Sequence, residues 1–156
     1  MSTRLAKQFT YDAPAEAVAA MLDDQAFREE VLRRQKVVRG SAKVDGDHVR
    51  IEQVRSAKDL PSFAAKLVGD EIVIVQEETW TSPTGCDVHL SIPGKPGEAV
   101  GTMQLVESGG TTTEQVDLVL TVRIPLVGGK IEGLISGLFK EALDIEHRVG
   151  VEWLSR

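Results

Sequence analysis

Two hydrophobic periodicities divide this chain. Much of it alternates apolar and polar residues with a period of two, as the strands of a half-buried sheet do. The clearest case runs from Thr112 to Ile124, where apolar residues alternate with polar ones such as Asp117. Beyond Pro125 the apolar residues recur every three or four positions, from Ile131 to Trp153. This spacing predicts one C-terminal helix over residues 127–154, roughly 40 Å long at 1.5 Å per residue.

Turn and capping residues predict the other elements. Asp12 and Pro14 suit the start of a short helix, with Val18 and Leu22 on its apolar face. A second short helix is expected over residues 24–34. Strands are expected over residues 4–12, 37–44, 48–55, 71–80, 87–92, 99–107 and 112–124, with a hairpin turn at Asp45-Gly46. The order β-α-α-β6-α predicts an α+β fold, a curved seven-stranded antiparallel sheet around the long C-terminal helix.

Composition narrows the class of protein. At 156 residues we expect a single domain over residues 1–156. The net charge of −6 disfavours binding to nucleic acid, which depends on Lys and Arg contacts to phosphates. The sequence shows neither an apolar leader nor a stretch long enough to span a membrane, so we expect no integral membrane association. With one cysteine, Cys86, which we interpret as buried and unreactive, a cytoplasmic location is expected.

Motifs near both ends resemble a known superfamily. They are the opening Phe9-x-Tyr11-x-Ala13-Pro14-x-Glu16-x-Val18 and the strand-Pro125-helix ending. Over essentially the whole chain they resemble the START-like, helix-grip superfamily (SRPBCC). Leu60-Pro61-x-Phe63 and the segment 124–130 resemble most a bacterial branch known as a domain of unknown function. The resemblance implies the helix-grip fold. The superfamily includes lipid carriers, hormone receptors, cyclases, oxygenase subunits and chaperone activators, so fold does not decide activity.

The residue types that usually carry chemistry do not form a recognisable motif. His48, His89 and His147 are scattered and lack a partner at metal-ligand spacing, so no metal site and no cofactor is expected. The basic run from Arg28 to Arg39 is interrupted by Glu29 and Glu30, and we interpret it as a solvated helix face. Catalytic residues cannot be named from the sequence, and an enzyme is the less favoured interpretation.

A curved sheet around one long helix usually encloses a cavity, here expected to measure several hundred Å³. The predicted wall residues are apolar side chains of the inner faces: Phe63, Trp80, Val88, Met103, Leu118, Leu120, Leu134, Leu138 and Phe139. If the Trp80 face of its strand is concave, Gln76 and Glu78 project into the cavity, and Gln53 and Gln104 are expected to join them. Such a carboxylate could orient a ligand, move a proton, or simply lie in water at the rim of the sheet.

Two further features bear on a cavity. The segment 58–70 interrupts the strand series with about two helical turns between Pro61 and Gly69, and Phe63 and Leu67 on one face predict a lid. Gly133 and Gly137 in the long helix indicate either tight packing on the sheet or space left at a ligand entrance.

Three functions remain open from the sequence. The first is binding of an apolar or amphipathic small molecule, such as a fatty acid, sterol-like lipid or polyketide. The second is a cyclase or dehydratase using the same cavity, with Glu78 or a neighbour moving a proton. The third is a protein-interaction domain without a ligand. The oligomeric state and the identity of any ligand are not predicted.

Overall fold

Seven strands form one antiparallel sheet in the expected order. The structure, a computed structural model, describes residues 2–156 apart from the side chain of Asp59. The strands are β1 (Thr3–Tyr11), β2 (Arg39–Asp45), β3 (His48–Ser56), β4 (Glu71–Ser82), β5 (Gly85–Ser91), β6 (Gly97–Ser108) and β7 (Thr111–Val122). The helices are α1 (Ala15–Leu22), α2 (Gln25–Arg34), the short 3-10 turn η1 (Ala57–Asp59), α3 (Ser62–Val68) and α4 (Gly128–Leu154). The predicted α+β helix-grip fold is therefore confirmed.

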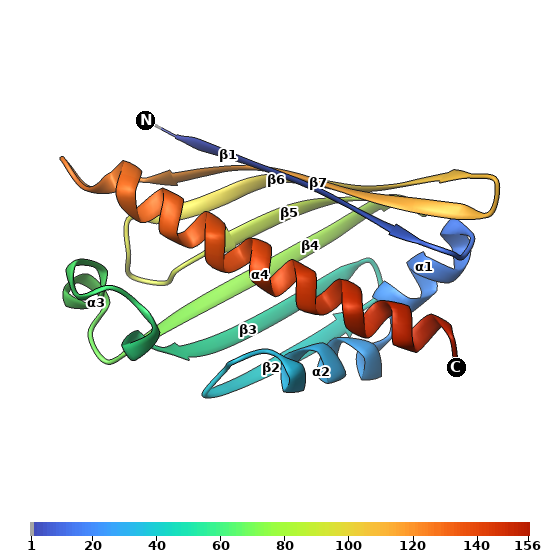
Figure 1. Ribbon diagram of the computed structural model, residues 1–156, viewed down its shortest axis with the longest axis horizontal. Coiled ribbons are helices and arrows are strands. Elements are labelled where there is room, and N and C mark those ends of the chain that lie inside the picture. The colour runs from blue at the N-terminus through green and yellow to red at the C-terminus, as the bar shows by residue number, and fades with distance from the viewer. Residues whose placement is uncertain (1) are drawn as a thin grey trace.

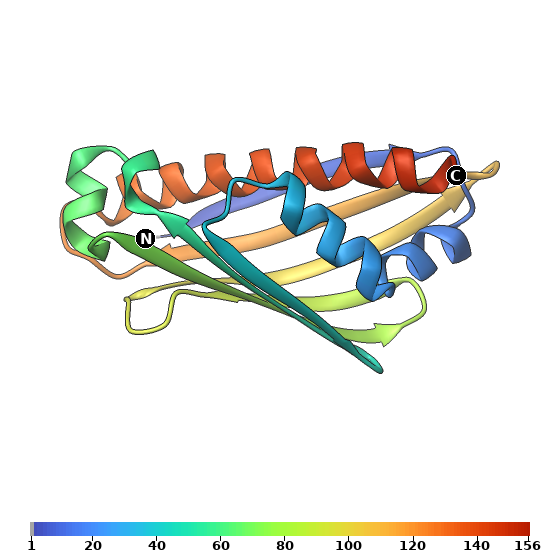
Figure 2. The ribbon, with the colours of Figure 1, turned by 90° about the horizontal axis from the view of Figure 1, so that it is seen from below.

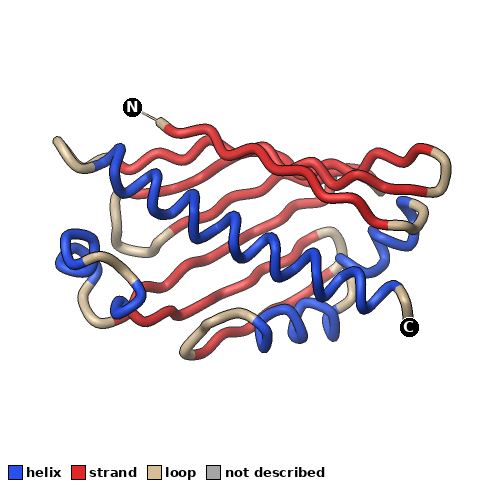
Figure 3. The backbone as a smooth tube through the Cα atoms, in the orientation of Figure 1, coloured by secondary structure: helices blue, strands red, loops and turns tan. Residues whose placement is uncertain are grey.

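The sheet order is β1-β7-β6-β5-β4-β3-β2, so the first strand pairs with the last. Successive strands from β2 to β7 are neighbours, and short loops join most of them (Figure 3). Leu5 of β1 lies opposite Leu118 of β7, which brings two apolar side chains to the same face. The strands β6 and β7 approach closely at Gly101, where a Cβ atom would lie 2.0 Å from the carbonyl oxygen of Asp117.

The long helix α4 crosses the strands diagonally on the concave face of the sheet (Figure 1). The helices α4 and α3 lie on the same side of the sheet (Figure 2). Ile131, Leu143 and Val149 form part of the buried side of α4. Near the C-terminal end, Gly150 lets the helix approach the ring of Tyr11, because an added Cβ would lie 2.9 Å from its Cε1 atom. The predicted helical stripe is therefore the face that packs on the sheet.

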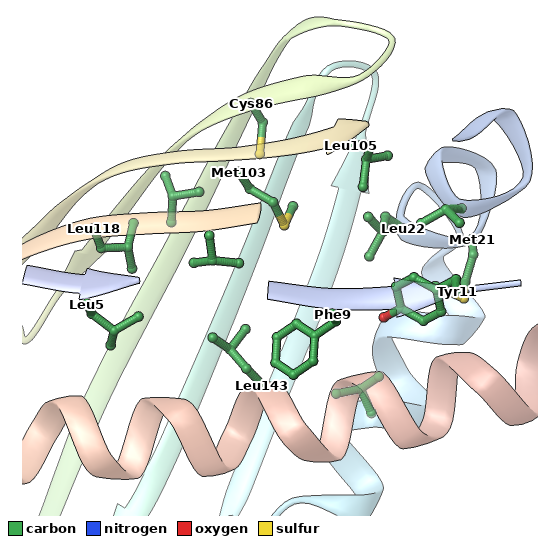
Figure 4. Close-up of a cluster of buried hydrophobic side chains, with 14 of the residues drawn as sticks. Leu5, Phe9, Tyr11, Met21, Leu22, Cys86, Met103, Leu105, Leu118 and Leu143 are labelled. Carbon is green, nitrogen blue, oxygen red and sulfur yellow. The ribbon is translucent and has the colours of Figure 1, made fainter. Parts of the chain in front are cut away.

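The core lies between the sheet, α1 and the second half of α4. Figure 4 shows Met103 and Leu118 from the sheet, Met21 and Leu22 from α1, and Leu143 from α4 converging there. Each of these five side chains is at most 8% exposed. Cys86 belongs to the same cluster, which agrees with the expectation that it is buried. Burial in this apolar cluster raises the pKa of its thiol.

Some local predictions were wrong. Asp12 does not cap α1; instead Glu107, at the end of β6, accepts a hydrogen bond of 2.7 Å from the backbone N–H of Ala15. The cap of α2 is Asp24, whose side chain accepts from the N–H of Ala26. Tight packing of Gly133 is not observed, because the position of its Cβ is open, and the same holds for Gly137.

Candidate functional site

A cavity of about 140 Å³ lies between α4 and the concave face of the sheet. Strands β3 to β7 form one wall and the first two thirds of α4 form the other. At one end the cavity is bounded by Ala64 and Leu67 of α3 and by Lys95 of the β5–β6 loop, of which Leu67 and Lys95 are exposed. At the other end it is bounded by Arg28 and Glu146, which are buried. We call these the open end and the closed end.

The cavity is smaller than the several hundred Å³ expected. Long side chains from α4, including Leu134, Leu138 and Phe139, line it. Its wall is mainly aliphatic, as Ile51, Ile74 and similar residues contribute from the strands. A cavity of about 150 Å³ in another protein binds benzene, so the available space suits a small apolar group.

The Trp80 face of β4 is the inner face. Ile72, Ile74 and Gln76 line the cavity from it, and Gln53 of β3 joins them as expected. Gln104 does not, because the inner positions of β6 are the odd-numbered ones, such as Met103, and Gln104 is exposed on the outer face. The expectation for Gln104 was therefore wrong by one position in the alternation.

The predicted wall residues occupy three kinds of position. Five of them line the cavity: Leu120, Leu134, Leu138, Phe139 and Gln76. Four belong to or pack against the core cluster beside it: Trp80, Val88, Met103 and Leu118. Glu78 is buried beyond the closed end, and Phe63 lies outside the cavity on α3. The alternation thus located the inner face, but it did not distinguish the cavity from the solid part of the core.

A buried ion pair stands directly behind the closed end. Arg28 of α2 is 2% exposed and Glu78 of β4 is 1% exposed. The Nη1 and Nη2 atoms of Arg28 donate to the two carboxylate oxygens of Glu78 at 3.1 and 2.7 Å, and its Nε donates to the carbonyl oxygen of Leu22 at 2.7 Å. Gln76 and Trp80 also donate to Glu78, at 2.7 and 3.2 Å. Each oxygen of Glu78 therefore accepts two hydrogen bonds, so this carboxylate is fully occupied within the protein.

Two more carboxyl groups face the same guanidinium. Glu146 of α4 lines the cavity, with its Oε2 3.8 Å from Nη1 of Arg28. Glu114 of β7 is 1% exposed and accepts a long hydrogen bond of 3.4 Å from the hydroxyl of Tyr11. The other oxygen of Glu114 is buried without a hydrogen-bond partner in the described part of the chain.

Burial sets the protonation of this cluster. Loss of solvation, reinforced by the charge of Glu146, raises the pKa of Glu114 to about 8. Loss of solvation also raises the pKa of Glu146, although the charge of Arg28 opposes the shift. The pKa of Tyr11 is raised by burial and by the neighbouring Glu114, so its hydroxyl remains a donor. One fixed cation therefore stands among three carboxyl groups, of which two hold their protons more tightly than usual.

The sequence profile of one family covers nearly the whole chain. The family described as "Protein of unknown function (DUF2505)" matches residues 7–154. The chain belongs to this family.

Curated relatives agree with this assignment. "Uncharacterized protein Rv0481c" of Mycobacterium tuberculosis (strain ATCC 25618 / H37Rv) is 32% identical over 114 residues. That match covers 69% of this chain and 64% of the relative, so the chain spans just under two thirds of the length of these curated relatives. "Uncharacterized protein Mb0491c" of Mycobacterium bovis matches with the same identity and coverage.

Solved structures share the fold of this DUF2505 protein. The Zhui aromatase/cyclase from Streptomyces sp. R1128 is similar with a TM-score of 0.70 and 9% identity, over 100% of this chain and 95% of that one. A START superfamily protein from Mycobacterium smegmatis gives a TM-score of 0.61 and 19% identity, over 97% of this chain and 98% of that one. At such identities the likeness shows a START-like helix-grip fold, which confirms the resemblance found in the sequence.

The prediction of a solvated basic run was wrong for Arg28. Arg33, Arg34 and Arg39 are exposed, as expected, and they form ion pairs with surface carboxylates. Arg28 instead lies beside Phe27, on the side of α2 that packs inward. Its position one turn before Val31 and Leu32 was the available signal, because residues three and four apart share a helix face.

Helix α3 borders the open end, but not as predicted. Ala64, Leu67 and Val68 line the cavity, whereas Phe63 is 36% exposed and does not. The ring of Phe63 instead lies 5.0 Å from Nζ of Lys130, at the start of α4. Phe63 therefore connects α3 to α4 on the outside of the cavity.

The outer face of the sheet is largely polar. Ion pairs cover it at Arg4–Asp117, with 2.8 Å between charged atoms, and at Arg50–Glu77, with 2.9 Å. Val100 and Val119, which lie opposite each other on β6 and β7, are large apolar side chains exposed there, and Val106 of β6 is a third. This face gives limited support to the interaction hypothesis.

The histidines occupy separate places. His89 lies 3.1 Å from Glu98 on the outer face, and Nε2 of His147 lies 2.8 Å from the carbonyl oxygen of Thr10. Within residues 2–156, no group of three His, Cys, Asp or Glu side chains is arranged to hold a metal ion. In the same residues, no helix is both long enough and apolar enough to cross a membrane.

Proposed function

We propose that this DUF2505 protein binds an apolar or amphipathic small molecule in the cavity between α4 and the sheet. The observation that carries the proposal is the cavity itself, walled by aliphatic side chains of five strands and of helices α2, α3 and α4, open at α3 and closed at Arg28. Such concave, mainly apolar sites with few polar groups are typical of small-molecule binding. The START-like fold of the relatives in solved structures supports the same class of function.

The hydrogen bonds that Glu78 already accepts favour binding over catalysis. A general acid or base must reach a substrate with a free proton or lone pair. The carboxylate of Glu78 is held by Arg28, Gln76 and Trp80 on both oxygens. The cyclase or dehydratase alternative, which named Glu78 or a neighbour as the group that moves a proton, therefore loses Glu78.

Native mass spectrometry of the protein purified from cells tests the proposal. We expect an additional mass that is released by organic solvent. The variant Ala142→Phe fills the cavity from α4 and should remove that mass, because Ala142 lines the cavity. Val151→Phe adds the same ring to an exposed position of α4 and should leave the mass in place. A ligand-free protein that also fails to bind toluene in an NMR titration would contradict the proposal.

A further inference from the structure

The closed end of the cavity holds an acid without a hydrogen-bond partner among the described residues. Glu146 is 9% exposed, lines the cavity, and forms no hydrogen bond within the described part of the chain. Its nearest charged contact is Arg28, at 3.8 Å, which is longer than a hydrogen bond. A largely buried carboxyl group in this state is stabilised by a ligand group that can hydrogen-bond to it.

The neighbouring polar groups are already engaged with one another. Arg55 donates to Gln53, Gln53 donates to Gln35, and Gln35 donates to the carbonyl oxygen of Ala142 on α4. Gln76 uses its NH2 group on Glu78, which leaves its carbonyl oxygen without a hydrogen bond among the described residues. Glu146 and the amide oxygen of Gln76 are therefore the groups left to meet a ligand, and both line the cavity.

The charge balance defines what these two groups can accept. Glu78, Glu114 and Glu146 surround a single guanidinium, that of Arg28. An anionic ligand would bring a further negative charge to a site where carboxyl groups already outnumber the cation. Three of the five N–H donors of the guanidinium also have partners within 3.1 Å already. A carboxylate at this end is therefore disfavoured, although a fatty acid would otherwise suit the apolar walls.

A hydroxyl group suits the two groups that remain, Glu146 and the amide oxygen of Gln76. It can donate one hydrogen bond and accept others, so it can pair with a carboxyl group in either protonation state. The pKa of Glu146 is raised, which favours its protonated form. A protonated carboxyl group can also donate to the hydroxyl oxygen. Resting on the proposed binding function, we infer that the ligand enters with an uncharged hydroxyl group foremost and that this group hydrogen-bonds to Glu146 at the closed end.

Four matched probes test the inference by NMR titration of the protein at pH 7. They are toluene, benzyl alcohol, benzylamine and benzoate, which share one ring and differ in the attached group. We expect benzyl alcohol to bind about fivefold more tightly than toluene, equivalent to about 1 kcal/mol for one hydrogen bond. We expect benzoate to bind most weakly.

Variants of Glu146 show whether that residue is responsible. Glu146→Leu should remove the preference for benzyl alcohol over toluene, whereas Glu146→Gln should retain it, because an amide still donates and accepts. Glu141→Gln changes an exposed carboxylate on the same helix and should leave all four affinities unchanged. Circular dichroism melts of the three variants establish that each one is folded.

The possible outcomes separate this inference from the proposed function. Equal binding of toluene and benzyl alcohol would overturn the inference while leaving a binding cavity in place. Tightest binding of benzylamine would show a cation site, and tightest binding of benzoate would show an anion site at Arg28; either result overturns it. Retention of the preference in Glu146→Leu does so as well. Absence of binding by all four probes would contradict the proposed function and the inference together.

Discussion

Replacing Arg28 by methionine should lower the free energy of unfolding much more than the position of Arg28 in a short helix suggests. The change keeps an unbranched side chain of similar helix propensity but removes the guanidinium. Glu78 then loses two of its four hydrogen bonds while remaining 1% exposed. The carbonyl oxygen of Leu22 also loses the donor that bound it at 2.7 Å.

The expected cost is about 3–5 kcal/mol of the free energy of unfolding, as found when one partner of a buried ion pair is removed. Glu146 and Glu114 add to this, because Arg28 is the cation that opposes the rise in their pKa values. By contrast, removing the exposed Arg4–Asp117 pair with Arg4→Met should cost at most about 1 kcal/mol.

Urea denaturation followed by circular dichroism measures these free energies. The second variant needed is Arg28→Met with Glu78→Gln, in which the uncompensated charge is absent and the amide can still accept from Trp80. It should recover about 1–3 kcal/mol relative to Arg28→Met alone, within the range of coupling energies for residues in contact. A loss below about 1 kcal/mol for Arg28→Met, or no recovery in the double variant, would refute the view that Arg28 neutralises a buried cluster.

Three other predictions follow. Because the folded-state pKa of Glu114 is about 8 and its ordinary value is 4.5, stability should fall as the pH rises from about 4.5 to 8, where the unfolded chain has lost a proton that the folded protein retains. Glu114→Gln should flatten that decline in urea midpoints; an unchanged slope would refute the assignment. Gly133→Ala should stabilise α4 by up to about 1 kcal/mol, since its Cβ position is open, whereas Gly150→Ala should destabilise it against Tyr11, and thermal melts with the opposite order would contradict this. Phe63→Ala should cost less than the roughly 3–5 kcal/mol of a core phenylalanine, because the ring is 36% exposed, and a core-sized loss in urea would refute this.

The elements of the fold could be predicted because each depends on local periodicity. A period of two marked the strands, a period near 3.6 marked α4, and Asp45-Gly46 marked the β2–β3 hairpin, whose two-residue turn is Gly46-Asp47. Their assembly into a curved sheet around one helix agreed with the fold that the resemblance to the helix-grip superfamily implied. The size of the cavity could not be predicted, because it depends on how far Leu138 and Phe139 reach toward the sheet. Wall residues and ordinary core residues have the same apolar composition, so Leu118 and Leu120 look alike in the sequence while only Leu120 lines the larger cavity.

The polar cluster was harder to predict because its members come from four elements. Arg28, Glu78, Glu114 and Glu146 lie on α2, β4, β7 and α4, and no spacing in the sequence connects them. Each nevertheless stands at a position that its own periodicity assigns to the interior. Glu114 has the parity of the buried Val116, and Glu146 lies one turn from both Leu143 and Val149.

A charged residue at an interior position needs a partner, since burial of an isolated ion is too costly. The numbers of interior cations and carboxyl groups therefore show which charged groups lack an ion-pair partner. Here the count is one guanidinium against three carboxyl groups, and the geometry assigns the guanidinium to Glu78. The excess carboxyl groups must then be protonated or bound by something else. Glu114 is buried away from the cavity and meets this need by its raised pKa, with the Tyr11 hydroxyl nearby. Glu146 faces the cavity, so an incoming hydroxyl group can satisfy it.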